Sequence, residues 1–169
     1  KGKVIAIEAD PNNFDMLNKN IKLNELSEHV ITLNFAATSN KSKVKLSIPE
    51  KKSGHTIYSS IIPNRAPTEK FNEVNANTLD NLLHENGISI EEVNWIKIDV
   101  EGAELEVLKG ATNVLSKNKD ISLLIEIHNI ENGKNLYRPI MDLLDNYNFK
   151  KEFEKIHSTG ERHLIVSKQ

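Results

Sequence analysis

The sequence predicts an α/β fold, a sandwich of helices around a mostly parallel β-sheet that ends in an antiparallel pair of strands. Continuous apolar runs, typical of strands covered on both faces, alternate with segments whose apolar residues recur at helical spacing. Strands that alternate with helices in this way favour a parallel sheet. With 169 residues, 38% of them hydrophobic, we expect one domain at 1–169.

The chain opens on a predicted strand and helix. Val4 to Ile7 form an apolar run that ends at Glu8. Asp10 is a good N-cap and Pro11 a preferred first helical residue, so a helix should begin there. Its apolar face consists of Phe14, Leu17 and Ile21.

The next segment mixes β-type runs with turn residues. Residues 30–38 predict a second strand, and Val44, Leu46 and Ile48 alternate as in a short strand. Residues 49–77 contain three of the five prolines and many polar residues. We interpret this stretch as a surface excursion near a binding edge.

The second half of the chain continues the alternation. Residues 78–86 predict a short helix, with Thr78 as N-cap and Gly87 where a left-handed residue ends a helix. The sequence from Glu101 onward predicts a helix that Gly110 weakens in its middle. The other expected elements are strands at 95–100 and 121–127, a helix around 140–147, and an antiparallel pair at 149–156 and 163–166.

Charge and composition limit the partners of the chain. The formal net charge is -2, so there is no basic field to hold a nucleic acid or an anionic membrane, and we expect a small or neutral partner. Cysteine is absent, which excludes disulfides and is compatible with a cytoplasmic location. No apolar run approaches the roughly 18 residues of a membrane span. The sequence leaves open whether the chain forms a homo-oligomer.

Polar clusters follow several predicted strands. In parallel sheets, ligands bind outside the carboxyl ends of the strands. A carboxylate at such an end can accept both hydroxyls of a ribose, although it can also simply favour the N-terminus of the next helix. A nicotinamide-linked oxidoreductase would use the same acid. The clusters are Glu8, Asn34 to Thr38, Asp99 with Glu101, and Glu126 with His128.

An ordered series of motifs from Lys3 to about Glu126 resembles the FkbM family of methyltransferases. The most distinctive piece is Ile96-Lys97-Ile98-Asp99-Val100-Glu101-Gly102-Ala103-Glu104. In a nicotinamide-linked oxidoreductase this run would have no role. The other pieces are Lys3 to Pro11 with Leu17 and Asn20, Asn34 to Ser39, Thr78-Leu79-Asp80, and Leu108-Lys109-Gly110-Ala111.

The resemblance implies a Rossmann-like methyltransferase sandwich that uses S-adenosylmethionine. It further implies methyl transfer to a hydroxyl of a sugar or small natural product. Glu8 would bind the ribose and Ala9 would lie beside the adenine, with Ala36 and Ala37 in the turn that lines the adenine pocket and Asn34 offering an amide. Ordinary packing of the alanines and local capping by Asn34 are the alternatives. A non-catalytic binding module on the same sheet is the third functional class.

Four side chains are candidates for catalysis: Asp99, Glu101, Glu126 and His128. The negative charge of Asp99 would favour the sulfonium of the cofactor. Glu101 would either contribute to the same site or stabilise the N-terminus of the following helix. Glu126 and His128 stand two apart on one face of a strand, and His128 is the candidate general base, with a surface histidine as the alternative. The four would also suit Mg or Mn, but we expect no metal.

The start of the chain is abrupt. It has no starting Met, and none of its glycines forms a Gly-x-Gly pattern. The resemblance places a glycine-rich cofactor loop upstream of Lys1. We therefore expect a fragment without the first strand and helix, one that binds the cofactor more weakly than its parent. The missing first strand would lie at the centre of the sheet. Without it, the remaining strands either leave a gap there or pair directly with each other.

Overall fold

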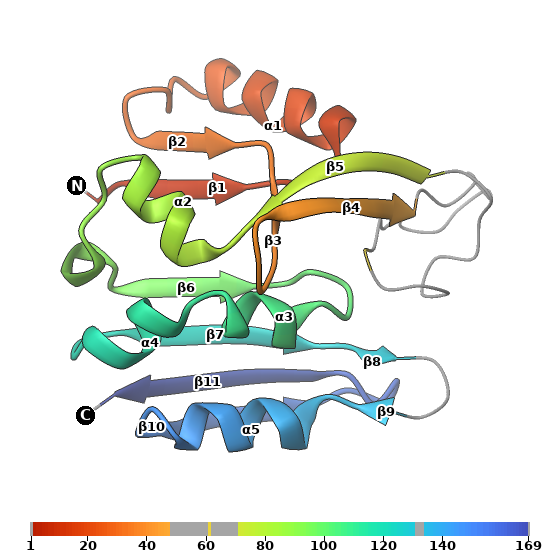
Figure 1. Cartoon of the computed structure of the whole chain (residues 1–169), viewed down its shortest axis with the longest axis vertical. Helices are drawn as coiled ribbons and strands as arrows, with labels where there is room; N and C mark the ends of the chain where they lie inside the picture. The colour runs from red at the N-terminus through yellow and green to blue at the C-terminus, as the bar shows by residue number, and fades with distance from the viewer. Residues whose placement is uncertain (1, 48–60, 62–70, 131–133, 169) are drawn as a thin grey trace.

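The computed structural model describes residues 2–47, 61, 71–130 and 134–168 and has the predicted α/β architecture (Figure 1). The helices are α1 (Pro11–Leu23), α2 (Leu79–Glu85), α3 (Glu104–Lys109), α4 (Thr112–Lys117) and α5 (Tyr137–Asp145), with a 3-10 turn at Ile90–Glu92. The strands are β1 (Val4–Ile7), β2 (Val30–Leu33), β3 (Ala36–Ala37), β4 (Ser42–Ser47), β5 (Phe71–Asn77), β6 (Trp95–Ile98), β7 (Ser122–Ile127), β8 (Asn129–Ile130), β9 (Lys134–Asn135), β10 (Phe149–Ile156) and β11 (Arg162–Lys168).

The strands combine parallel and antiparallel pairs. Strand β1 pairs in parallel with β2, and β6 pairs in parallel with β7. The larger sheet has the order β10-β11-β7-β6, in which β11 is antiparallel to both neighbours. Strands β3, β5 and β4 form a separate sheet. The predicted antiparallel closing pair is therefore confirmed.

The main core lies on one face of β7. Leu123, Ile125 and Ile127 alternate along the strand and are at most 2% exposed, because they pack under α3, α4 and α5. Burial of each such side chain stabilises the fold by about 1.5 to 3 kcal/mol. The same strand sets the site, since its register pairs Ile98 of β6 with Ile125. The residues that follow β6 and β7 consequently meet at one edge.

Two helix starts agree with the sequence. The side chain of Asp10 accepts a hydrogen bond from the backbone N–H of Asn12 at 2.8 Å, and Pro11 is the first helical residue of α1. Thr78 caps α2 by accepting from the N–H of Asn81 at 3.1 Å. Gly87 follows α2 with a φ of 68°, the left-handed conformation that favours glycine.

The helix predicted from Glu101 onward begins later and is divided. Glu101 and Gly102 have φ of 54° and 99°, values that a helix cannot contain, so α3 begins at Glu104. Gly110 then separates α3 from α4. A Cβ at Gly110 would lie 2.0 Å from the carbonyl oxygen of Thr38, so this glycine permits a close approach between two backbones.

Residues 30–38 form two strands and not one. Strand β2 ends at Leu33, whereas Ala36–Ala37 pair with β5 in another sheet. Most of the predicted excursion, at 49–60 and 62–70, lies outside the described residues. Its last part forms β5, which buries Val74 and Ala76.

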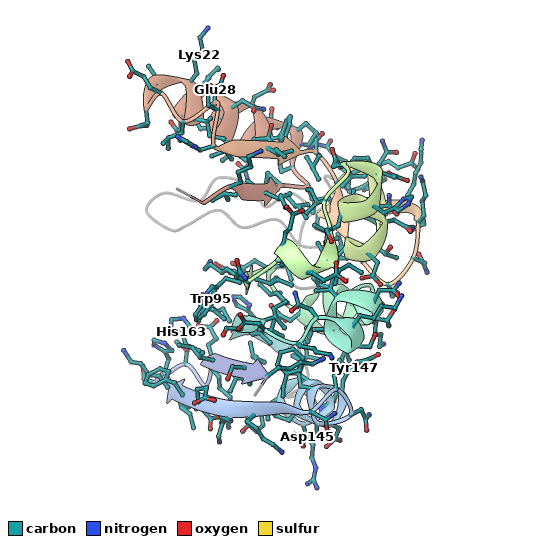
Figure 2. All side chains as sticks on the ribbon, turned by 90° about the vertical axis from the view of Figure 1, so that its left-hand side faces the viewer. Lys22, Glu28, Trp95, Asp145, Tyr147 and His163 are labelled. Atoms are coloured by element: carbon teal, nitrogen blue, oxygen red, sulfur yellow. The ribbon has the colours of Figure 1, made fainter. Side chains whose placement is uncertain are left out.

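A cleft separates the two parallel pairs of strands. In the described part of the chain, β1 pairs only with β2 and β6 only with β7, so the two strands do not close up. Of the two expected outcomes, the gap at the sheet centre is therefore the one observed: the cleft measures about 1370 Å³ and is lined along β1 and β6 by apolar residues such as Val4, Ile7 and Ile96. Trp95, 62% exposed, lies at the start of β6 (Figure 2). Among the described helices, none has the length and apolar character needed to cross a membrane.

Candidate functional site

The carboxyl ends of the strands supply polar and small residues to the cleft. Glu8 and Ala9 follow β1, and Asp99 follows β6; all three line the cleft. Glu101, Ala36 and Ala37 line it as well. Six of the residues singled out from the sequence, from three segments distant in the chain, therefore share one cavity.

Glu8 is half-buried at the end of β1. Its Oε1 accepts a hydrogen bond from the backbone N–H of Asp10 at 2.8 Å, which fixes the carboxylate beside the start of α1. Burial raises the pKa of the Glu8 carboxyl above its ordinary value of 4.5, and the hydrogen bond from Asp10 opposes that shift. The group is thus an acceptor that is held in place and partly shielded from water.

Asn34 lies behind this carboxylate. Its Nδ2 donates to the carbonyl oxygens of Glu8 at 2.8 Å and Ala9 at 3.2 Å. It does not cap its own turn, and it is not among the residues that line the cleft. Asn34 therefore holds the end of β1 in position, while its amide faces the protein backbone.

Ala36 and Ala37 form β3, not the turn that we expected. Ala36 is 4% exposed and packs with Leu46, Val74 and Ala76 in a second, smaller core cluster. Their backbone is fixed by parallel pairing with β5. They border the cleft as small residues on a strand.

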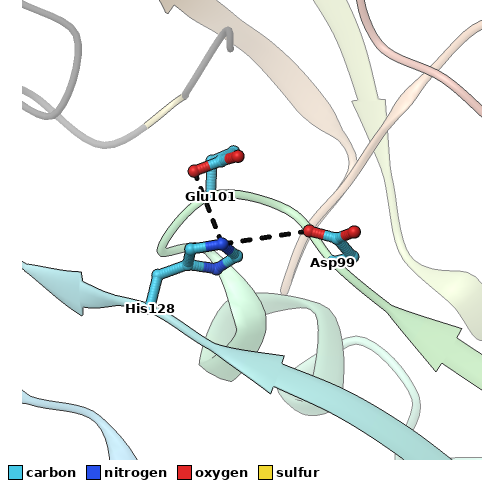
Figure 3. A group of neighbouring side chains, drawn as sticks. All are labelled: Asp99, Glu101 and His128. Atoms are coloured by element: carbon cyan, nitrogen blue, oxygen red, sulfur yellow. Dashed lines mark ion pairs between the residues drawn. The ribbon is translucent and has the colours of Figure 1, made fainter. Parts of the chain in front are cut away.

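His128 is the centre of an acidic cluster (Figure 3). Its Nε2 lies 3.5 Å from Glu101 Oε2, 3.8 Å from Glu126 Oε1 and 3.9 Å from Asp99 Oδ1. The four predicted catalytic side chains are thus brought together. His128 is only 4% exposed, so the alternative of a surface histidine is wrong. The carboxylates would stabilise positive charge on the ring once it accepts a proton.

Two of these carboxylates have further partners. Asp99 Oδ2 lies 2.7 Å from Lys97 Nζ, and Glu126 Oε2 lies 3.2 Å from His163 Nε2. Both Asp99 and Glu126 keep about a third of their side-chain surface exposed, 35% and 29%. Lys97 therefore offsets part of the Asp99 charge that we expected to act on a cation.

The cluster also has the composition of a cation site. Asp99, Glu101 and His128 each offer one ligand atom, and these atoms lie within 4.8 Å of one another. Carboxylate oxygens with one imidazole suit a hard divalent ion such as Mg²⁺ or Mn²⁺. The geometry of the cluster is therefore compatible with two roles, a histidine that accepts a proton and a site for a divalent cation.

Glu104 is a site residue that the sequence pattern did not single out. It belongs to the motif Ile96 to Glu104, yet it is 0% exposed and its Oε1 lies 2.7 Å from His128 Nδ1. A signal was present in the sequence: Glu104 precedes Val107 and Leu108 at helical spacing, which places an acid on the apolar face of α3.

Three comparisons with known proteins all find similarity to methyltransferases. The family model described as the methyltransferase FkbM domain matches residues 1–151. The curated relatives include methyltransferase sdnD of Sordaria araneosa, 28% identical over 65% of this chain and 51% of its own length. They also include hexuronic acid methyltransferase AglP of Haloferax volcanii, 30% identical over 76% of this chain and 48% of its own length.

The crystal structure of a methyltransferase FkbM from Methylobacillus flagellatus has a similar fold. It superposes with a TM-score of 0.63 at 17% identity, over 98% of this chain and 36% of that one. The chain spans about half the length of the curated relatives it matches.

Proposed function

This chain belongs to the FkbM methyltransferase family, and from that premise we propose that the full-length protein transfers a methyl group from S-adenosylmethionine to a hydroxyl of a sugar or small natural product. The observation that carries the proposal is that Glu8, Asp99 and Glu101 line the same cleft, with His128 in contact with Glu101. The relative AglP is a hexuronic acid methyltransferase, which supports the proposal of a sugar acceptor.

The residues along the cleft suit S-adenosylmethionine. Glu8 offers a fixed, half-buried carboxylate to the two hydroxyls of the ribose. Ala9, Ala36 and Ala37 are small enough to let a flat base approach the backbone, and Asn34 keeps the end of β1 in register for that contact. Asp99 supplies negative charge toward the sulfonium.

The acceptor hydroxyl must lose its proton as it gains the methyl group. When bound, S-adenosylmethionine supplies an electrophilic methyl carbon on a sulfonium. His128 receives the hydroxyl proton at Nε2, because an imidazole exchanges protons near neutral pH. Glu101 and Glu126, at 3.5 and 3.8 Å, stabilise the imidazolium that forms.

A divalent cation site is the second candidate for the same cluster, favoured by the ligand atoms of Asp99, Glu101 and His128 that lie within 4.8 Å. The Nε2 lone pair can serve a proton or a metal, but not both. Titration of the full-length protein with Mn²⁺ in a calorimeter separates the two. A general base predicts no saturable heat, whereas a metal site predicts binding that Asp99→Asn weakens.

Glu8→Ala is expected to weaken S-adenosylmethionine binding by about 1.5 to 3 kcal/mol, the usual loss of hydrogen bonds to a charged group. The reason is that the variant removes the acceptor for the ribose hydroxyls. Calorimetric titration of the full-length protein measures this difference. Unchanged affinity would remove Glu8 from the site.

The pH dependence of S-adenosylmethionine binding tests the role of the Glu8 carboxylate in a second way. Its pKa is raised, so the ionised form is lost as pH falls through a value above 4.5. Affinity for S-adenosylmethionine should therefore fall on acidification at a higher pH than an exposed glutamate would give, and in Glu8→Gln this component should be absent. Asp15→Asn, an exposed position on α1, is the matched charge control.

A further inference from the structure

Glu104 is a fully buried acid at the first position of α3. It is 0% exposed and lies among the residues of the main core. Burial of a carboxylate costs several kcal/mol unless hydrogen bonds or a charge partner compensate for it. A carboxylate in this position therefore needs a specific partner.

Its partners are on one oxygen. Glu104 Oε1 accepts a hydrogen bond from the backbone N–H of Gly102 at 2.9 Å and lies 2.7 Å from His128 Nδ1. The turn at Glu101 and Gly102, with positive φ at both residues, delivers that N–H to the carboxylate. Glu104 Oε2 has no hydrogen-bond partner among the described residues.

These contacts indicate which nitrogen of the His128 ring carries the hydrogen. A carboxylate has no hydrogen to donate, so Oε1 accepts both from the N–H of Gly102 and from His128, and Nδ1 carries the hydrogen. In a neutral ring the lone pair then lies on Nε2. That nitrogen is the one that faces Asp99, Glu101 and Glu126.

We propose that Glu104 is the positioning residue of His128: it holds the ring in the Nδ1–H tautomer, so that Nε2 is the proton acceptor at the rim of the cleft. Its part in catalysis rests on the methyl transfer proposed above, but the tautomer is a property of the protein alone. When the carboxylate that orients a catalytic histidine is replaced by an amide and the ring takes the wrong tautomer, kcat falls by up to about 10⁴-fold.

Nitrogen-15 NMR of the histidine rings in the full-length protein tests the proposal, with spectra between about pH 6 and pH 9 to identify the neutral form. We expect His128 in the Nδ1–H tautomer. Glu104→Gln should shift the population toward Nε2–H, because an amide can donate to Nδ1. It should lower kcat by up to about 10⁴-fold and leave the KM for S-adenosylmethionine near wild type.

Two further variants make the test specific. Glu106→Gln, two residues further along α3 and hydrogen-bonded to Ser39, should leave the tautomer of His128 unchanged, and Glu104→Asp should keep the Nδ1–H form if it folds. A wild-type ring in the Nε2–H form, or one doubly protonated throughout, would overturn the proposal, and that spectrum needs no variant to fold. If His128 has the Nδ1–H form but the protein transfers no methyl group, the positioning of His128 by Glu104 is confirmed and the proposed function is wrong.

Discussion

His128→Ala is expected to lower the turnover of the full-length protein by about 10²- to 10⁴-fold, the usual contribution of a positioned general base. Methyl transfer develops positive charge on the acceptor oxygen as the new C–O bond forms, and loss of the hydroxyl proton to the imidazole relieves that charge. Cofactor affinity should stay close to wild type, because His128 is not among the residues that line the cleft. Turnover and calorimetric affinity, measured on the same preparation, check both statements.

His163→Ala is the matched control. His163 also contacts Glu126, at 3.2 Å, but it lies on β11 and is 37% exposed, so the variant should stay active. The wild-type rate should rise with pH as the imidazole of His128 loses its proton, and His128→Ala should lose that dependence. A fully active His128→Ala would leave Asp99 or Glu101 as the acceptor-side candidate.

Gly110→Ala is expected to destabilise the fold by about 3 kcal/mol or more, the upper range for overpacking. The added Cβ would lie 2.0 Å from the carbonyl oxygen of Thr38 and 3.3 Å from the Cα of Thr78, and backbone cannot move aside as a side chain can. The N–H of Asp80 also donates to the carbonyl of Gly110 at 3.1 Å, so α2, α3 and the end of β3 would shift together. Urea denaturation measures the free energy of unfolding.

The other glycines provide graded controls for this prediction. Gly2→Ala meets nothing within 4 Å and should be neutral, whereas Gly87→Ala has space but a φ of 68°, and should cost about 1 to 2 kcal/mol. A Gly110→Ala protein as stable as Gly2→Ala would show that the two backbones do not approach as described.

The elements that could be predicted are those defined by local sequence. The apolar runs of β1, β6 and β7, the cap at Asp10 and the glycine after α2 each depend on neighbours along the chain. The residues at the ends of these strands followed from the same reasoning, since parallel strands present their carboxyl ends at one edge. The meeting of Asp99 with His128 was therefore accessible from sequence alone.

What could not be predicted depends on contacts across the fold. The start of α3 was misplaced because Glu101, a residue without helix-breaking character, adopts a positive φ next to Gly102. From the sequence, Gly110 is only a residue that weakens a helix. Its close approach to the backbone of Thr38 depends on a contact between distant segments. Asn34 reads as a turn residue, but its amide crosses to the carbonyl groups of Glu8 and Ala9.

The central claim is that the residues at the carboxyl ends of β1 and β6 bind S-adenosylmethionine, and a calorimetric titration of the full-length protein with S-adenosylmethionine, S-adenosylhomocysteine and NAD tests it most directly. We expect saturable, one-to-one binding of the first two and none of NAD, with affinity reduced in Glu8→Ala. Binding of NAD alone would favour a nicotinamide-linked oxidoreductase. No binding of any of the three would favour a module that has kept the sheet without the cofactor, and would contradict the function proposed for this protein.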